Sequence, residues 1–119
     1  MIRGCLVVVM FVTSACATGT LAEPYTARGQ EPGWLLTITA DSIRYNGDYG
    51  ATQIDEPLTA QTRLPNGRRY EGGRLRVEVT HARCNDVMSG HGYSDAVAIQ
   101  VDGSRLDGCG GARRTDWDM

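Results

Sequence analysis

The sequence predicts an all-β domain, a small antiparallel meander folded as a barrel or a sandwich of seven or eight short strands. Apolar and polar residues alternate over several short stretches, and turn residues separate these stretches at spacings of about 8–12 residues. Fifteen glycines favour turns and bulges over long helices, and no segment shows a sustained helical period. Two cysteines in the C-terminal half predict a single disulfide.

Each expected strand follows from its own pattern. Leu75, Val77 and Val79 make the clearest inward face, and Val97 to Val101 repeat the alternation. The pairs Asn46-Gly47 and Asp102-Gly103 are hairpin signals, because their residues tolerate a positive φ. Together these patterns place strands at 34–39, 43–45, 51–54, 58–64, 68–70, 75–79, 97–101 and 106–109.

Length and charge limit the possible functions. A chain of 119 residues allows one domain. The net charge is −2 and the sequence has no basic run, so nothing in it indicates a nucleic-acid partner. No motif in the chain points to a cofactor.

The N-terminal segment has the features of an export signal. Arg3 is its positive charge, and Cys5 to Val12 form an apolar run of eight residues, whereas a membrane-spanning helix needs about 20. Residues 13–16, Thr-Ser-Ala-Cys, resemble a bacterial lipobox, which would place a lipid on Cys16. Ordinary cleavage after Ala17 or Ala22 is the alternative.

These features divide the chain into four parts. Residues 1–16 are expected to be the signal, 17–28 a tether, 29–111 the β domain, and 112–119 a loose polar tail. The protein is therefore expected on the periplasmic side of a cell envelope, anchored to the membrane by its lipid. If the cell is Gram-negative, the outer membrane is favoured, because Ala17 gives no signal for retention at the inner membrane.

The remaining cysteines, Cys84 and Cys109, are expected to form a disulfide in an oxidising compartment. Their Cα atoms should then lie roughly 4.4–6.8 Å apart. A zinc site is the alternative, with His81 and His91 completing a set of two nitrogens and two sulfurs.

Three short segments resemble a family of small bacterial envelope lipoproteins. Members of that family have a G-N-E-P-F-W start, a C-x-D-x-M-S-G-x-x-Y-P loop and a G-C-G ending. The chain matches them at Glu31, Pro32 and Trp34, at Cys84 to Tyr93, and at Cys109 with its flanking glycines. It departs from the pattern at Gln30, Gly33 and Ser94. The resemblance implies a β-rich envelope lipoprotein and implies no activity.

Residues Ser89, Gly90 and Tyr93 also fit an S-G-x-x-Y pattern, which resembles the inhibitory loop of bacterial lysozyme inhibitors. In those proteins the serine and tyrosine hydroxyls enter the lysozyme cleft. A glycosidase cleft holds two carboxyl groups, and hydroxyls on an ordered loop can donate to them without burying a charge. The resemblance implies that Ser89 and Tyr93 make the contact, and the predicted binding residues are Ser89, Gly90, His91, Tyr93 and Asp86.

Structural roles are expected for several of these side chains. Asp86 should accept backbone N–H groups of its own loop. Met88 is expected to fill the end of the barrel, and Trp34 is expected in the core. Ser89, His91 and Asp95 have the residue types of a hydrolase triad, but one short loop gives them no rigid support.

The sequence therefore predicts a non-enzymatic envelope lipoprotein that binds a partner, such as a host or environmental lysozyme, through the loop from Cys84 to Tyr93. The alternative is a structural envelope lipoprotein without a soluble target. An inhibitor should expose the hydroxyls of Ser89 and Tyr93, whereas a structural cap should bury both.

Overall fold

A computed structural model describes residues 23–30 and 32–119 of the chain. It is almost entirely β-structure, with two short 3₁₀ helices, η2 (Asp48–Gly50) and η3 (Thr115–Trp117). The strands are β1 (Tyr25–Gly29), β2 (Trp34–Ile38), β3 (Ser42–Gly47), β4 (Thr52–Pro57), β5 (Ala60–Leu64), β6 (Gly67–Glu71), β7 (Leu75–Thr80), β8 (Cys84–Asn85), β9 (Gly92–Val101) and β10 (Ser104–Arg113).

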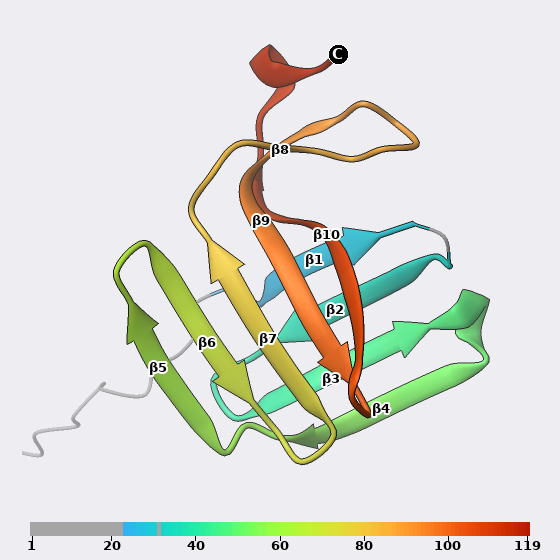
Figure 1. The fold of residues 1–119 in the computed structure, drawn as a ribbon, viewed down its shortest axis with the longest axis vertical. Coiled ribbons are helices and arrows are strands. Elements are labelled where there is room, and N and C mark those ends of the chain that lie inside the picture. The colour runs from blue at the N-terminus through green and yellow to red at the C-terminus, as the bar shows by residue number, and fades with distance from the viewer. Residues whose placement is uncertain (1–22, 31) are drawn as a thin grey trace, which may run out of the picture.

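The strands form one curled antiparallel sheet in the order β4-β3-β2-β1-β10-β9-β7-β6-β5, with the short β8 paired to β9 (Figure 1). Almost every neighbour in the sheet is also a neighbour along the chain, and the pairing of β1 with β10 joins the two ends of the meander. The predicted all-β meander with one disulfide is confirmed.

The sheet is open between its two edge strands, β4 and β5. One side chain of the edge strand β4 forms hydrogen bonds with a distant part of the sheet. The carboxylate of Glu56 on β4 accepts hydrogen bonds from the backbone N–H groups of Arg74, at 3.0 Å, and Leu75, at 2.8 Å. The edge strand β4 is thereby tied to the start of β7.

The core lies on the inner side of the curled sheet, where alternate residues of each strand point. Each fully buried aliphatic side chain of this kind contributes roughly 1.5–3 kcal/mol to stability. Trp34 belongs to this core, as predicted, and is 5% exposed. The other large buried members are Leu36, Ile38, Ile43, Tyr45, Ile54, Leu75, Val77, Val79, Val97 and Ile99.

Two strands that the sequence pattern did not predict complete the sheet. β8 lies in the segment expected to be an irregular loop, and β1 lies in the expected tether. The tether prediction was therefore wrong for residues 25–28. β1 lacks an apolar period because its buried residues, Ala27 and Gly29, are small, and the Trp34 ring occupies the space beside Gly29.

The hairpin predictions had different outcomes. Asp102 and Gly103 form the turn between β9 and β10, and both have a positive φ, at 49° and 87°. Asn46 and Gly47, by contrast, belong to β3, and the chain turns after them at Asp48 and Tyr49. The buried ring of Tyr45 lies against Gly47, so the glycine provides room for packing instead of a turn.

Asp95 on β9 is a buried carboxylate, 5% exposed, with two side-chain partners. The hydroxyl of Tyr25 donates to it at 2.8 Å, and the Nδ1 atom of His81 lies 2.8 Å from its other oxygen. Burial and the nearby carboxylate raise the pKa of Tyr25, so its hydroxyl stays protonated and donates. Asp95 thus contacts His81 and not His91, the histidine that is closer to it in the sequence.

The C-terminal segment is also ordered differently from the prediction. β10 runs to Arg113, η3 follows, and the backbone N–H of Met119 donates to the carbonyl of Gly90 at 3.0 Å. The expected loose tail at 112–119 was wrong, because this segment folds back onto the β8–β9 connection.

No helix in the described part of the chain is long and apolar enough to cross a membrane. The predicted export signal, the lipidation residue Cys16 and the motif residue Glu31 lie outside the described residues.

Candidate binding site at the Asp86 loop

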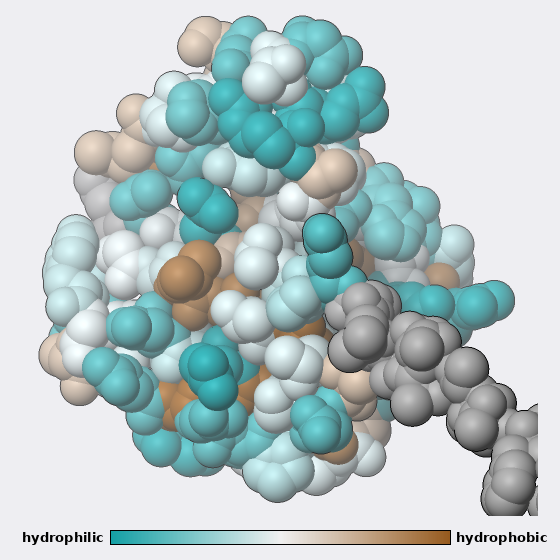
Figure 2. Space-filling model, turned by 180° about the vertical axis from the view of Figure 1, so that it is seen from behind, coloured by the Kyte–Doolittle hydropathy of each residue, from teal (hydrophilic) through white to brown (hydrophobic). Residues whose placement is uncertain are grey.

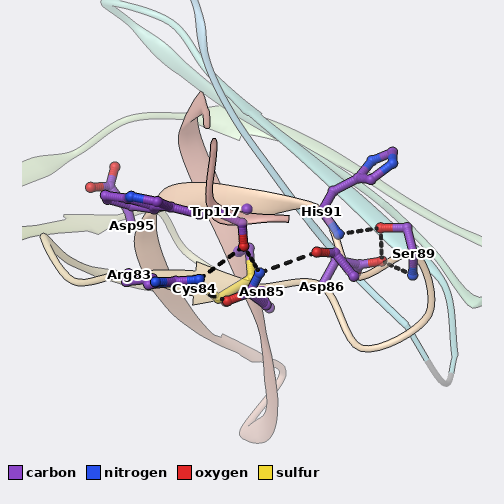
Figure 3. The surroundings of a disulfide bond; sticks show 12 residues. Arg83, Cys84, Asn85, Asp86, Ser89, His91, Asp95 and Trp117 are labelled. Carbon is purple, nitrogen blue, oxygen red and sulfur yellow. Dashed lines mark hydrogen bonds between the residues drawn. A yellow bond between two sulfur atoms is a disulfide. The ribbon is translucent and has the colours of Figure 1, made fainter. Parts of the chain in front are cut away.

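The candidate site is the connection between β8 and β9, residues 86–91, which we call the Asp86 loop (Figure 3). The pairing of Cys84 with Tyr93 brings the two ends of the loop together. The backbone N–H of Asp86 donates to the His91 carbonyl at 2.9 Å, and that of Gly90 donates to the Asp86 carbonyl at 2.8 Å. Gly90 has a φ of 74°, which permits the sharp return.

Asp86 organises this loop through its carboxylate, as predicted. It is 5% exposed and accepts hydrogen bonds from the backbone N–H of Ser89, at 3.0 Å, and from its hydroxyl, at 2.8 Å. Burial alone would raise the pKa of Asp86, but the two hydrogen bonds from Ser89, together with the polar groups of the Gln30 side chain and the Met88 backbone nearby, outweigh it and lower the pKa. The loop is therefore built around a charged carboxylate.

The two hydroxyls expected to face a partner are not placed as an inhibitor of the S-G-x-x-Y type requires. Ser89 is exposed, but its Oγ donates to Asp86 and accepts from the His91 backbone N–H at 3.1 Å. Tyr93 is only 6% exposed, and the guanidinium groups of Arg28 and Arg113 both lie over its ring, 5.5 and 5.7 Å from the ring centre. The prediction of two outward hydroxyls was therefore wrong, because Tyr93 packs within the domain.

The exposed part of the loop is its apolar tip. Val87 is 82% exposed and Met88 is 66% exposed, whereas Met88 was expected to fill the end of the barrel. That expectation was wrong, because the bonds from Ser89 to Asp86 turn the intervening residues outward. His91, at the far end of the loop, is also exposed.

Two of the motifs recognised in the sequence come together beside this loop. A hollow of about 180 Å³ is lined by residues 29–30, 84–87 and 107–109. Gln30 and Asp86 both line this hollow, so the start of the domain lies beside the loop. Trp34 lies behind this region, in contact with Gly29 and Gly108, and Pro32 is half-buried.

The predicted disulfide between Cys84 and Cys109 is confirmed, with its Cα atoms 5.6 Å apart. It joins β8 to β10 and forms one wall of the hollow. The alternative zinc site was wrong, because both sulfurs are already bonded to each other. The part of the chain that the structure describes contains no cluster of three or more residues arranged to bind a metal.

Comparison with known proteins yields no match to a protein-family model, to a curated protein or to a solved structure. The resemblance to envelope lipoproteins stays a prediction.

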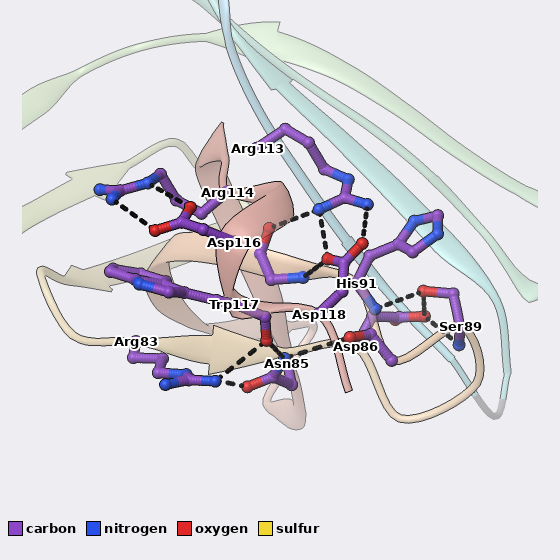
Figure 4. Close-up of polar contacts among 12 residues, drawn as sticks. Arg83, Asn85, Asp86, Ser89, His91, Arg113, Arg114, Asp116, Trp117 and Asp118 are labelled. Atoms are coloured by element: carbon purple, nitrogen blue, oxygen red, sulfur yellow. Dashed lines mark hydrogen bonds and ion pairs between the residues drawn. The ribbon is translucent and has the colours of Figure 1, made fainter.

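The C-terminal segment, which was expected to be a loose tail, also belongs to this site. Trp117 contacts Arg83 and Asn85, which precede the loop (Figure 4). Asp118 contacts Gly92, which follows the loop. A tryptophan in an otherwise polar tail is the one available signal, because an isolated large aromatic residue usually packs against something.

Proposed function

We propose that this protein is an exported, non-enzymatic binding module that contacts a protein partner through the tip of the Asp86 loop. The observation that supports the proposal is the exposure of two adjacent apolar side chains, Val87 and Met88. They stand on a loop that Asp86 and the disulfide hold in one shape. A pre-ordered loop loses little conformational entropy on binding, which favours affinity.

The hollow beside the tip indicates the shape of the partner. Val87 is one of the residues that line the hollow, so the surface has a projecting apolar tip with a concave area directly beside it. A folded protein with an apolar groove and a neighbouring apolar side chain would fit both. Central contacts of this kind usually carry most of the binding energy of an interface.

A lysozyme is the first partner class to test, because the S-G-x-x-Y resemblance is the sequence feature that points to a class of partner. The contact would have to differ from the one first expected, since Tyr93 is buried and the hydroxyl of Ser89 serves Asp86. In the proposed form, Val87 and Met88 make the contact, and Ser89 shapes the loop.

A structural envelope lipoprotein is the second candidate, and the positions of Ser89 and Tyr93 favour it. Ser89 and Tyr93 both support the domain itself, as expected for a cap with no soluble target. The two candidates differ in one respect. Only the binding module requires the apolar tip to be in contact with another protein.

Site-specific photo-crosslinking tests the binding proposal. With a benzophenone amino acid in place of Val87, we expect one crosslinked adduct of defined mass in cells that export the protein. The matched control is Leu35, which is 46% exposed on β2. The substitution Met88→Asp should abolish the adduct at position 87. Equal adducts at positions 87 and 35, or none at 87, would favour the structural candidate.

Purified c-, g- and i-type lysozymes then test the partner class. The protein should slow the lysis of cells by one of them, and Met88→Asp should weaken this inhibition by about tenfold or more, as at a central contact residue. If none of the three is slowed, lysozyme is excluded as the partner, and the crosslinking result alone decides the binding proposal.

We further propose that Cys16 carries a lipid that holds the domain at the membrane. The Thr-Ser-Ala-Cys segment supports this, and β1 begins only nine residues after Cys16, so the tether is short. Mass spectrometry of membrane-extracted protein should show an N-terminal lipidated cysteine. A mature soluble form that begins at Thr18 or Glu23 would show ordinary secretion instead.

A further inference from the structure

The segment from Arg113 to Met119, which we call the C-terminal clamp, satisfies the backbone at the end of the Asp86 loop. The Arg114 N–H donates to the Gly92 carbonyl at 2.8 Å, and the Met119 N–H donates to the Gly90 carbonyl at 3.0 Å. In the other direction, the Gly92 N–H donates to the Asp118 carboxylate at 2.9 Å. Gly90 and Gly92, the two glycines of the loop motif, are therefore both held by the clamp.

Asp118 makes three hydrogen bonds within this region (Figure 4). Besides the Gly92 N–H, it accepts two hydrogen bonds from the Arg113 guanidinium, at 2.6 and 2.8 Å. The Arg113 pair and the Gly92 bond lower the pKa of Asp118 to about 2, so it is charged at any physiological pH. Arg113 in turn lies over the Tyr93 ring, which links the clamp to the start of β9.

Trp117 is a second residue that attaches the clamp to the rest of the domain. Its ring lies between the guanidinium groups of Arg83 and Arg114, and its carbonyl accepts hydrogen bonds from Asn85 at 2.8 Å and Arg83 at 3.0 Å. A Cβ atom at Gly92 would lie 2.5 Å from the Trp117 Cβ, so the two segments approach too closely for any residue but glycine. The clamp therefore fits the loop specifically.

The contacts of the clamp are mostly polar and lie at a hydrophilic end of the molecule, the upper end in Figure 2. The clamp adds no residue to the hydrophobic core. Half-exposed ion pairs contribute little to global stability, but hydrogen bonds at a loop can control its local opening. The clamp is thus suited to fixing the loop without deciding whether the domain folds.

We infer that Asp118 is a positioning residue, which fixes the end of the Asp86 loop through Gly92 and so sets the shape in which the apolar tip is presented. Its effect on binding rests on the proposed function, whereas its effect on loop order does not. A matched control lies two residues away. Asp116 makes the same kind of arginine pair, with Arg114, but no hydrogen bond to the loop.

Amide hydrogen exchange followed by NMR tests this inference. We expect Asp118→Ala to speed exchange at Gly90, His91 and Gly92 by about tenfold or more, because the opening of this segment no longer breaks the hydrogen bond from Gly92 to the charged Asp118. Asp116→Ala should leave these rates nearly unchanged. Amides of β7 and β9 that lie deep in the sheet should exchange at wild-type rates in both variants.

Two results would overturn the inference. One is equal loop exchange in the Asp118 and Asp116 variants. The other is equal acceleration of the core amides in the Asp118 variant, which would make its role one of global stability. The photo-crosslink at position 87 separates this inference from the proposed function. Faster loop exchange without any wild-type adduct would leave the positioning role standing and reject the binding module.

Discussion

Replacing both cysteines, with Cys84→Ala and Cys109→Ala together, is expected to lower the free energy of unfolding by about 3.5 kcal/mol. The bond closes a loop of 25 residues, and loop-closure entropy in the unfolded chain gives this magnitude. A domain of this size is usually stabilised by only about 5–15 kcal/mol in total. The double substitution is preferred, because it leaves no free thiol in the buried position of Cys109.

Urea unfolding of the oxidised wild type, the double variant and the reduced wild type provides the measurement. The reduced protein is the matched control, because it has lost the bond but keeps both sulfur atoms, and it should unfold close to the double variant. A loss below about 1 kcal/mol would show that the unfolded chain is not constrained as the entropic account requires. The Asp86 loop should loosen in both cases, because β8 loses its covalent attachment to β10.

The sequence pattern predicted the parts of the fold that depend on local alternation and local turn chemistry. Leu75 to Val79 and Val97 to Val101 became the central strands β7 and β9, and Asp102-Gly103 became a hairpin turn. In these segments, side-chain burial and backbone preference agree. β1 was not predicted, because the residues at its inward positions are small and show no apolar pattern. Such small residues are suitable there because the neighbouring Trp34 ring fills the space.

The candidate site was predictable to a similar degree. The roles of Asp86 and of the disulfide followed from residue type and compartment, and both are found in the structure. The burial of Tyr93 was not predictable, because it depends on Arg28 and Arg113, which are distant in the sequence. Contacts of this kind leave no periodic signal. The clamp was not predictable for the same reason, because its partners come from residues 83–92, which are distant from it in the sequence.

The meeting of the two motifs in space explains why both occur in one small domain. Gln30 precedes the Glu31-Pro32 segment, and it lines the same hollow as Asp86, which comes more than 50 residues later in the sequence. The start of the domain thus lies against one side of the loop, and the C-terminal clamp lies against another. Three separate parts of the chain hold one short loop in place, and this concentration of support favours a role that depends on the shape of the loop.

Asp86→Ala is expected to lower the free energy of unfolding by about 2–3 kcal/mol and to disorder the loop. The carboxylate is buried and accepts hydrogen bonds from the backbone N–H and the hydroxyl of Ser89, and hydrogen bonds to a charged group are worth about 1.5–3 kcal/mol. Ser89→Ala is the matched comparison. It removes one hydroxyl but keeps the Ser89 N–H bond, so it should cost only about 1 kcal/mol. Crosslinking through the tip should weaken far more in the Asp86 variant.

The pH dependence of this loss identifies its cause. The pKa of Asp86 is lower in the folded protein than in the unfolded chain, where it is about 3.9. Its stabilising contribution is therefore complete above that value and is lost as the pH falls through the lower, folded value. The difference in unfolding free energy between the wild type and Asp86→Asn should stay constant from about pH 7 to pH 5 and shrink below about pH 4. Urea unfolding at each pH measures this difference, in which the titration of other shared groups largely cancels. A difference that did not change with acidification would mean that the loop is organised by the shape of the Asp86 side chain and not by its charge.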